Sequence, residues 1–160
     1  MPEFAILPEK CVGCRLCELA CSAAFEWKYN PKLSRIRVMT VHPVSDIPVV
    51  CVQCKKPKCL EACPSEAIKW DKELGTVKVD PSLCIGCSTC VRECPFEAIL
   101  LHPTKNVAIK CELCGGKPKC VAVCPTGALV YAEPETMDSR RKQEYAAKVA
   151  RGVEETVLRK

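Results

Sequence analysis

Sixteen cysteines constrain this chain of 160 residues more than any other feature. They form four groups of four with none left over, and in every group the first two are separated by two residues and the last two by three. Aromatic residues make up only 5% of the chain, so its apolar core is expected to be small and to need stabilisation by cross-links. The candidates are disulfides and metal clusters. The groups are Cys11, Cys14, Cys17 and Cys21; Cys51, Cys54, Cys59 and Cys63; Cys84, Cys87, Cys90 and Cys94; Cys111, Cys114, Cys120 and Cys124.

Disulfides are the use of these cysteines expected in a short secreted chain. The segment Met1–Lys10 does not read as a secretory signal, because it lacks a basic start followed by an apolar run. No twin-arginine pair precedes Cys11, and no stretch approaches about 18 consecutive apolar residues. We therefore expect a cytoplasmic protein without a membrane span, in which reduced cysteines bind metal.

The groups are embedded in a longer repeat. Residues 64–68, 95–99 and 125–129 are versions of one segment that starts with proline, and Cys11–Cys14 resembles Cys84–Cys87. Such repetition indicates one supersecondary unit used several times. In each unit we expect a loop with three cysteines and then a short helix that carries the fourth and ends at proline.

Short strands should follow these helices. Residues 67–70 and 76–79 predict two paired strands joined by a turn at 71–75. Between the first and second cysteine groups, residues 35–41 predict one further strand.

The spacing C-x2-C-x2-C-x3-C-P is the ferredoxin pattern for [4Fe–4S] clusters. A tight loop supplies three ligands to one cubane, and the fourth cysteine ligates a different cluster, so that clusters form cross-ligated pairs. Glycine next to the second cysteine lets the backbone approach the sulfurs. Apolar neighbours would shield the clusters from water. These residues are Gly13, Gly86 and Gly115, and Val12, Val52 and Ile85.

Zinc is the main alternative, since two C-x2-C pairs can form a zinc ribbon. It does not explain a third cysteine in every group or the repeated segment that follows the fourth. The formal charge of +5 does not indicate a nucleic-acid partner. Each cluster with its four thiolates contributes about −2, which brings the loaded protein to roughly −3.

Over about residues 5–132 the chain resembles the four-cluster ferredoxin-like subunits that serve molybdenum and tungsten oxidoreductases, carbon monoxide dehydrogenases and some hydrogenases. The widened spacings Cys54-x4-Cys59 and Cys114-x5-Cys120 are typical of that family. The resemblance implies an α+β fold in which two ferredoxin-like two-cluster modules are nested. The inner module would span 48–104 and the outer one 5–30 with 105–132. Together they form a domain of residues 1–133, followed by a helical tail at 134–160.

The resemblance also implies that outer groups pair with each other and inner groups pair with each other. Ser22 departs from the family, since the other groups have proline after the last cysteine, but Cys21 remains as a ligand. The implied ligand sets are Cys11, Cys14, Cys17 and Cys124; Cys111, Cys114, Cys120 and Cys21; Cys51, Cys54, Cys59 and Cys94; Cys84, Cys87, Cys90 and Cys63.

A non-catalytic electron-transfer subunit is the function that this resemblance implies. The favoured partner is a cytoplasmic tungsten- or molybdenum-pterin aldehyde oxidoreductase, with ferredoxin or a flavin subunit as acceptor. The alternatives are a subunit of a nickel carbon monoxide dehydrogenase or a hydrogenase, a free polyferredoxin shuttle, or an iron–sulfur sensor. End-to-end stacking of copies stays possible. No Walker motif, GxGxxG fingerprint or nucleophile elbow occurs, so nucleotide or flavin chemistry is expected on another chain.

Other polar and aromatic residues favour structural roles. His42 and His102 each precede proline and read as loop residues, Trp27 and Trp70 as core residues, and Glu66 and Glu97 as turn residues at matching repeat positions. In the tail, a narrow apolar stripe predicts a helix that packs on its own domain or docks on another subunit. The stripe consists of Tyr145, Val149, Val153 and Val157.

Overall fold

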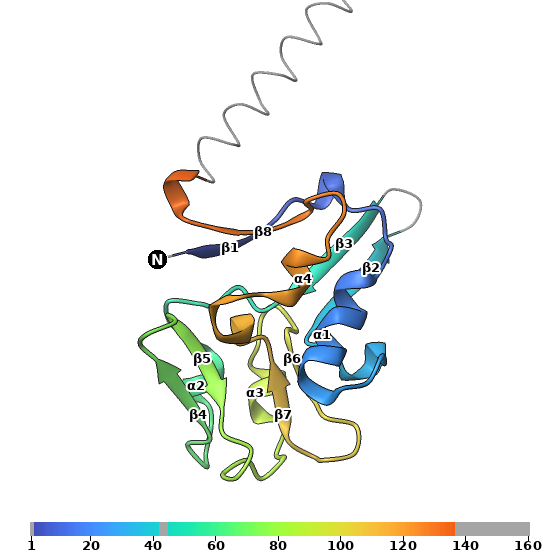
Figure 1. The fold of residues 1–160 in the computed structure, drawn as a ribbon. Coiled ribbons are helices and arrows are strands. Elements are labelled where there is room, and N and C mark those ends of the chain that lie inside the picture. Colours follow the sequence, from blue (N-terminus) through green and yellow to red (C-terminus); the bar gives the residue numbers. More distant parts are fainter. Residues whose placement is uncertain (1, 42–44, 137–160) are drawn as a thin grey trace, which may run out of the picture. The chain divides into compact units, whose positions relative to one another are not determined.

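The computed structural model describes residues 2–41 and 45–136. Within these ranges the chain forms short helices and four two-stranded sheets, which is a small α+β fold of the expected class (Figure 1). The strands are β1 (Glu3–Ile6), β2 (Ile36–Val41), β3 (Ser45–Val50), β4 (Ile68–Asp71), β5 (Thr76–Val79), β6 (Ile99–Leu101), β7 (Ala108–Lys110) and β8 (Leu129–Ala132). The α-helices are α1 (Leu16–Glu26), α2 (Lys58–Glu61), α3 (Thr89–Arg92) and α4 (Lys119–Ala122). Short 3-10 helices are η1 (Pro8–Lys10), η2 (Pro31–Leu33) and η3 (Leu113–Gly116).

All sixteen cysteines lie in one compact unit, residues 5–130. The other unit consists of residues 1–4 and 131–160, and its described part holds the start of β1 and the end of β8, which belong to one sheet. Within the described ranges, no helix is long and apolar enough to cross a membrane. His42 and the apolar stripe from Tyr145 to Val157 lie outside the described residues, so their predicted roles stay predictions.

The helices carry the third cysteine of each group, and the prediction that they also carry the fourth holds for the first group and is wrong for the other three. Cys59, Cys90 and Cys120 each occupy the second position of α2, α3 or α4. The fourth cysteine follows two residues beyond the helix. The reason is the proline after that cysteine, because proline disfavours helical backbone at the residue before it.

Ser22 explains why the first group differs. Since no proline follows Cys21, α1 continues to Glu26 and contains both Cys17 and Cys21. The Ser22 side chain is fully buried; its hydroxyl donates to the Leu19 carbonyl at 3.0 Å and accepts from the Asn30 amide at 3.1 Å. The serine therefore fixes the segment that leaves α1, where the other groups turn into a strand.

A left-handed turn after each proline confirms the predicted role of Glu66 and Glu97. Their φ angles are +50° and +49°, and Gly127, at the matching repeat position, has +66°. The three amides donate to the carbonyls of Cys63, Cys94 and Cys124 at 3.3, 3.2 and 3.4 Å. The turn directs the chain from the fourth cysteine into β4, β6 or β8.

The strand predictions at 67–70, 76–79 and 35–41 are confirmed as β4, β5 and β2 to within a residue at each end. β4 and β5 pair antiparallel, with Ile68 opposite Val79. The partner of β2, β3, was not predicted; it pairs antiparallel with Ile36 opposite Val50. Pro48 obscures this strand in the sequence, since proline lacks the amide that a central strand needs.

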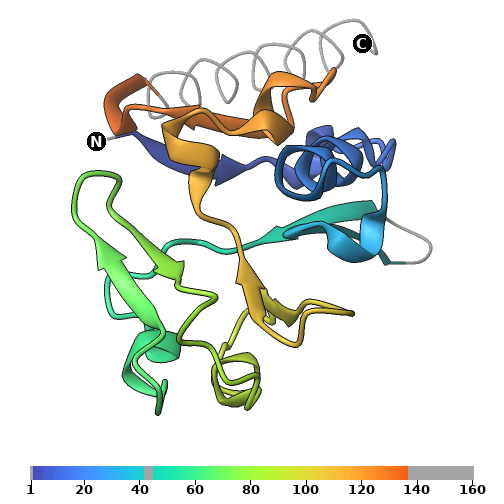
Figure 2. The same ribbon diagram turned by 60° about the horizontal axis from the view of Figure 1, so that its bottom comes forward.

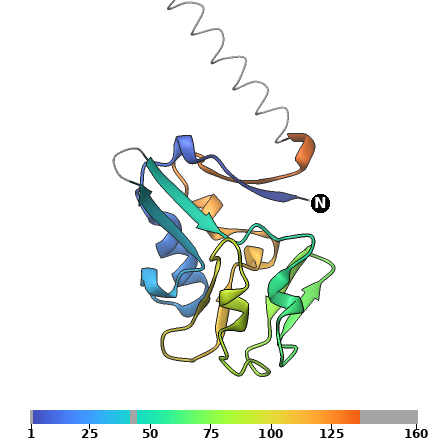
Figure 3. The ribbon, with the colours of Figure 1, turned by 180° about the vertical axis from the view of Figure 1, so that it is seen from behind.

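The helices of the cysteine groups pack in two pairs within the unit of residues 5–130. α1 contacts α4, and α2 contacts α3, while the hairpin of β2 and β3 runs beside α1 (Figures 1 and 3). The hairpins β4–β5 and β6–β7 lie next to each other through β5 and β7 (Figure 2). The first and last groups are thus neighbours, as are the two middle groups.

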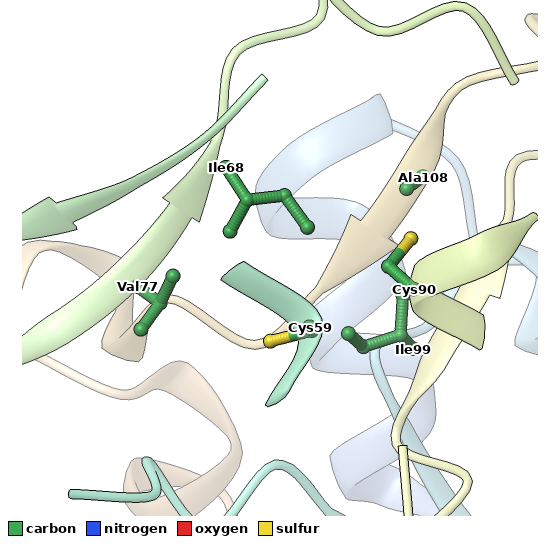
Figure 4. Close-up of a cluster of buried hydrophobic side chains, with 6 residues drawn as sticks. All are labelled: Cys59, Ile68, Val77, Cys90, Ile99 and Ala108. Carbon is green, nitrogen blue, oxygen red and sulfur yellow. The ribbon is translucent and has the colours of Figure 1, made fainter. Parts of the chain in front are cut away.

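A cluster of buried apolar side chains lies among the middle groups, where cysteines are part of the core (Figure 4). It contains Cys59, Ile68, Val77, Cys90, Ile99 and Ala108. The prediction that Trp27 and Trp70 pack in the core is wrong. Trp27 is 92% exposed just past the end of α1, and Trp70 in β4 is 40% exposed.

Candidate cluster-binding sites

Cys94 lies with the second cysteine group, not with its own. A hollow of about 390 Å³, partly open to solvent, is lined by Cys51, Cys54, Cys59 and Cys94. Val77, Phe96 and Lys110 also line this hollow. Thiols from two different groups therefore border one hollow.

Cys63 shows the reciprocal exchange. It lines a second hollow, of about 310 Å³, together with Cys84, Cys87 and Cys90. The Ala108 amide donates to the Cys84 sulfur at 3.3 Å. Within the lining of this hollow no lysine or arginine occurs, although the exposed Arg92 lies near Cys87. Each middle group thus contributes its first three cysteines to one hollow and its fourth cysteine to the other.

The outer groups show half of the corresponding arrangement. Cys21, from the first group, is an electrostatic neighbour of Cys111, Cys114 and Cys120. Cys21 also accepts a hydrogen bond from the Arg35 amide at 3.3 Å. Cys11 and Cys14 act on Cys17. For Cys124 the described contacts are with its own turn, including Thr126 at 3.8 Å, and no direct interaction with the first group is among them.

Burial opposes ionisation at the third cysteines. Desolvation raises the pKa of Cys17 and Cys90 to about 11, helped by Glu18 at Cys17 and by Cys84 at Cys90. Desolvation likewise raises the pKa of Cys120, the third cysteine of the last group, and raises that of Cys111, the first cysteine of the same group, to about 12. Thiolates at such positions need a bound cation, and a cluster with ferric and ferrous iron supplies positive charge where they converge.

Two fourth cysteines have the opposite bias. At Cys63 and Cys124 burial acts to raise the pKa, but hydrogen bonds lower it overall. The donors are the hydroxyls of Ser65 and Thr126 and the backbone amides of the turn that follows each proline. These N–H groups point at the sulfurs, as expected for amides that would stabilise a ligating thiolate.

The glycines of the cysteine loops have the left-handed backbone that favours glycine. Gly13 and Gly86 have φ angles of +65° and +70°. A Cβ at Gly86 would overlap the carbonyl oxygen and the side-chain amide of Asn106. Val52 and Ile85 line the two middle hollows, yet each is about half exposed or more, so they form the rims. Val12 is also exposed.

Three polar residues near the cysteines were not predicted from the sequence: Glu18, Gln53 and Lys110. Glu18 is buried and its Oε1 accepts from the Val38 amide at 2.7 Å. Gln53 donates through Nε2 to the Cys111 carbonyl at 3.0 Å and accepts from the Thr76 hydroxyl at 2.6 Å. No sequence signal separates these residues from surface positions, because their partners are distant in the chain.

His102 is a buried loop residue. Its Nδ1 accepts from the amides of Thr104 and Lys105 at 3.2 and 3.1 Å, and its Nε2 lies 3.3 Å from a carboxylate oxygen of Glu26. The loop assignment is therefore confirmed. Hydrogen bonding and charge from Lys105, followed by His102, hold the pKa of Glu26 below its usual value of 4.5.

The donor set of each middle hollow consists of four thiols. Among residues 2–41 and 45–136, no three His, Cys, Asp or Glu side chains converge as ligands of one ion do. Four thiols around a hollow instead match the four iron corners of a cubane. The residues of the two middle hollows therefore fit a [4Fe–4S] group.

Comparisons with known proteins agree with this chemistry. Residues 44–133 match the family described as 4Fe-4S dicluster domain, and residues 8–24 match the 4Fe-4S binding domain. The polyferredoxin-like subunit of aliphatic sulfonate oxidoreductase from Pyrococcus furiosus is 44% identical over 119 residues, which are 74% of this chain and 69% of that protein. The thiosulfate reductase electron transfer subunit PhsB from Salmonella typhi is 33% identical over 147 residues, 83% and 76% of the two chains.

A solved structure supports the fold alone. A chain of the active-site complex BamBC of benzoyl coenzyme A reductase, as isolated, has a TM-score of 0.50 and 24% sequence identity. The match covers 96% of this chain and 97% of that chain.

Proposed function

Because the chain belongs to the family of polyferredoxin-like proteins with a 4Fe-4S dicluster domain, we propose that it is the four-cluster electron-transfer subunit of an oxidoreductase. Multiple [4Fe–4S] clusters follow from the family and the sixteen cysteines, as predicted from the sequence. When bound, each cluster accepts and releases one electron. The protein's own residues hold the ligands, exclude water and set the local charge.

The proposed ligand sets are those implied by the sequence. Each middle site takes three cysteines from one group and the fourth from the other, namely Cys94 for the second group and Cys63 for the third. The outer groups would exchange Cys21 and Cys124 in the same way. The observation that carries this proposal is the pair of middle hollows, each lined by three cysteines of one group and one of the other.

Nested modules are the architecture that this exchange requires. The contacts of α2 with α3 and of α1 with α4 support an inner module at 48–104 within an outer one formed by 5–30 and 105–132. The proposed domain would then be residues 1–133, with 134–160 as a helical tail. Its proposed role is non-catalytic, which the similarity to a thiosulfate reductase electron transfer subunit supports.

The proposed partner is a catalytic subunit with a tungsten- or molybdenum-pterin centre, in the cytoplasm, with ferredoxin or a flavin subunit as acceptor. Similarity to a subunit of an aliphatic sulfonate oxidoreductase supports an oxidoreductase partner in general. A nickel carbon monoxide dehydrogenase or a hydrogenase is the second candidate, and a free shuttle the third. Purification of the untagged protein from its native host, with analysis for tungsten, molybdenum and nickel, tests the partner. A lone 17.6 kDa species would exclude a stable complex.

Metal analysis tests the clusters themselves. Anaerobically prepared protein should contain about sixteen iron and sixteen sulfide per chain, as four cubanes require. Stoichiometric zinc with little sulfide would contradict the proposal.

Cys94→Ala and Cys63→Ala form a matched pair that tests cross-ligation. Native alkylation under anaerobic conditions, read by peptide mass spectrometry, reports the cysteines that have lost their cluster. Cys94→Ala should expose Cys51, Cys54 and Cys59 to alkylation and leave the third group protected. Cys63→Ala should expose Cys84, Cys87 and Cys90 instead. If each substitution instead exposes the remaining cysteines of its own group, every group supplies all four ligands of one cluster and the proposed exchange is wrong.

A further inference from the structure

Lys110 is a cation buried at the end of β7, directly before Cys111. Only 3% of it is exposed. Its Nζ donates to the carbonyls of Val77 and Cys111, the latter at 2.9 Å, and lies 3.4 Å from the Gln53 side-chain oxygen. An ammonium has three N–H donors, so these neutral acceptors satisfy its hydrogen bonds but not its charge.

The charge of Lys110 has no carboxylate partner among the ion pairs of the described residues. Burying an ammonium without an opposite charge is costly, since desolvation is then uncompensated. Lys110 lines the hollow of Cys51, Cys54, Cys59 and Cys94. A cluster with four thiolates in that hollow would carry about −2 and provide the missing opposite charge.

The position of Lys110 is fixed by three elements. Val77 lies in β5, Lys110 in β7, and Gln53 in the loop between Cys51 and Cys54. Gln53 is itself held by the Thr76 hydroxyl and by the Cys111 carbonyl. The ammonium therefore has a defined place beside this hollow, unlike Lys58, an exposed lysine on the same lining.

We propose that Lys110 is the countercation of the cluster bound by Cys51, Cys54, Cys59 and Cys94, an inference that rests on the proposed function. As countercation, Lys110 raises the reduction potential of this cluster. Reduction adds negative charge, so a fixed positive charge beside the site favours the reduced state. Burial strengthens the effect, because the charge is not screened by water. The second middle hollow has no basic side chain in its lining and should not share this stabilisation.

Redox titration followed by electron paramagnetic resonance tests this role. Lys110→Met should lower the equilibrium constant for reduction of one cluster about tenfold, which is about 59 mV for one electron. Lys110→Gln, which keeps N–H donors without the charge, should give the same shift. Lys110→Arg and the control Lys72→Met, at an exposed lysine of the β4–β5 turn that lines neither middle hollow, should leave the titration close to wild type. Iron and sulfide are measured for every variant.

The outcomes separate this inference from the proposed function. Wild-type protein without about sixteen iron would contradict the four-cluster function itself. Fully loaded Lys110→Met and Lys110→Gln with wild-type titrations would overturn the role of Lys110 alone. Both neutral variants could instead lose a cluster. In that case the countercation role is supported if Cys51, Cys54 and Cys59 become alkylated in these variants while Lys110→Arg retains the cluster. Loss in Lys110→Arg as well would overturn it.

Discussion

Glu18 holds α1 against the free edge of β2, and its removal should destabilise the first cysteine group. The carboxylate is 1% exposed, and its Oε1 accepts from the Val38 amide at 2.7 Å. One turn further along α1, Cys21 accepts from the Arg35 amide at 3.3 Å. Because β3 pairs with the other edge of β2, these two side chains take the place of a third strand.

The size of the effect follows from that hydrogen bond. A bond to a charged group contributes about 1.5–3 kcal/mol, and a buried amide left without a partner costs about 1–3 kcal/mol. The two figures describe the same lost hydrogen bond and are not added. Since Glu18→Ala also removes a buried negative charge next to Cys17, we expect it to lower the free energy of unfolding by about 2 kcal/mol. Arg15, at 4.0 Å and half exposed, adds little, since exposed ion pairs contribute about 0–1 kcal/mol.

Glu18→Gln is the matched control, because its amide oxygen can still accept from Val38. We expect it to retain about half or more of the stability that Glu18→Ala loses. The assay is guanidinium unfolding of the loaded protein under anaerobic conditions, followed by far-ultraviolet circular dichroism and by cluster absorbance. Equal destabilisation by both variants would refute the hydrogen-bond argument, as would a wild-type midpoint for Glu18→Ala.

Two further predictions concern the glycine loops and acid stability. Gly86→Ala should release iron from its site, because Cβ would overlap Asn106, whereas Gly115→Ala, with a similar φ but open space, should cost only the left-handed strain of about 1–2 kcal/mol; equal iron content in the two variants would contradict this. The folded-state pKa of Glu26 is below its ordinary value, so its pairing stabilises the protein above about pH 4.5 and is lost as the pH falls through the folded-state pKa. Glu26→Gln should therefore lower the unfolding midpoint at pH 7, with a deficit that shrinks below about pH 4.5; a deficit that grows towards low pH would contradict the assignment.

Local structure followed from the sequence wherever a repeat or a turn signal was strong. The β4–β5 pair was predictable because alternating residues flank a turn that ends in Gly75. Glu66 and Glu97 were recognised as turn residues because they occupy matching positions of the repeat, and their positive φ angles agree with that role. The helix position was misjudged by a few residues, since proline after the fourth cysteine excludes that cysteine from the helix.

The sequence alone determined the chemistry of this protein, because sixteen cysteines at ferredoxin spacing predict [4Fe–4S] clusters wherever the chain places them. The family resemblance implied that Cys94 and Cys63 exchange sites, and the two middle hollows are lined in that way. Only the tertiary structure decided that Trp27 stays in solvent. It also placed the charge of Lys110, which precedes Cys111 in sequence, beside the second cysteine group. Residue spacing fixes which side chains are close along the chain. Charge and packing act between segments that are distant in sequence, and only the folded chain brings those together.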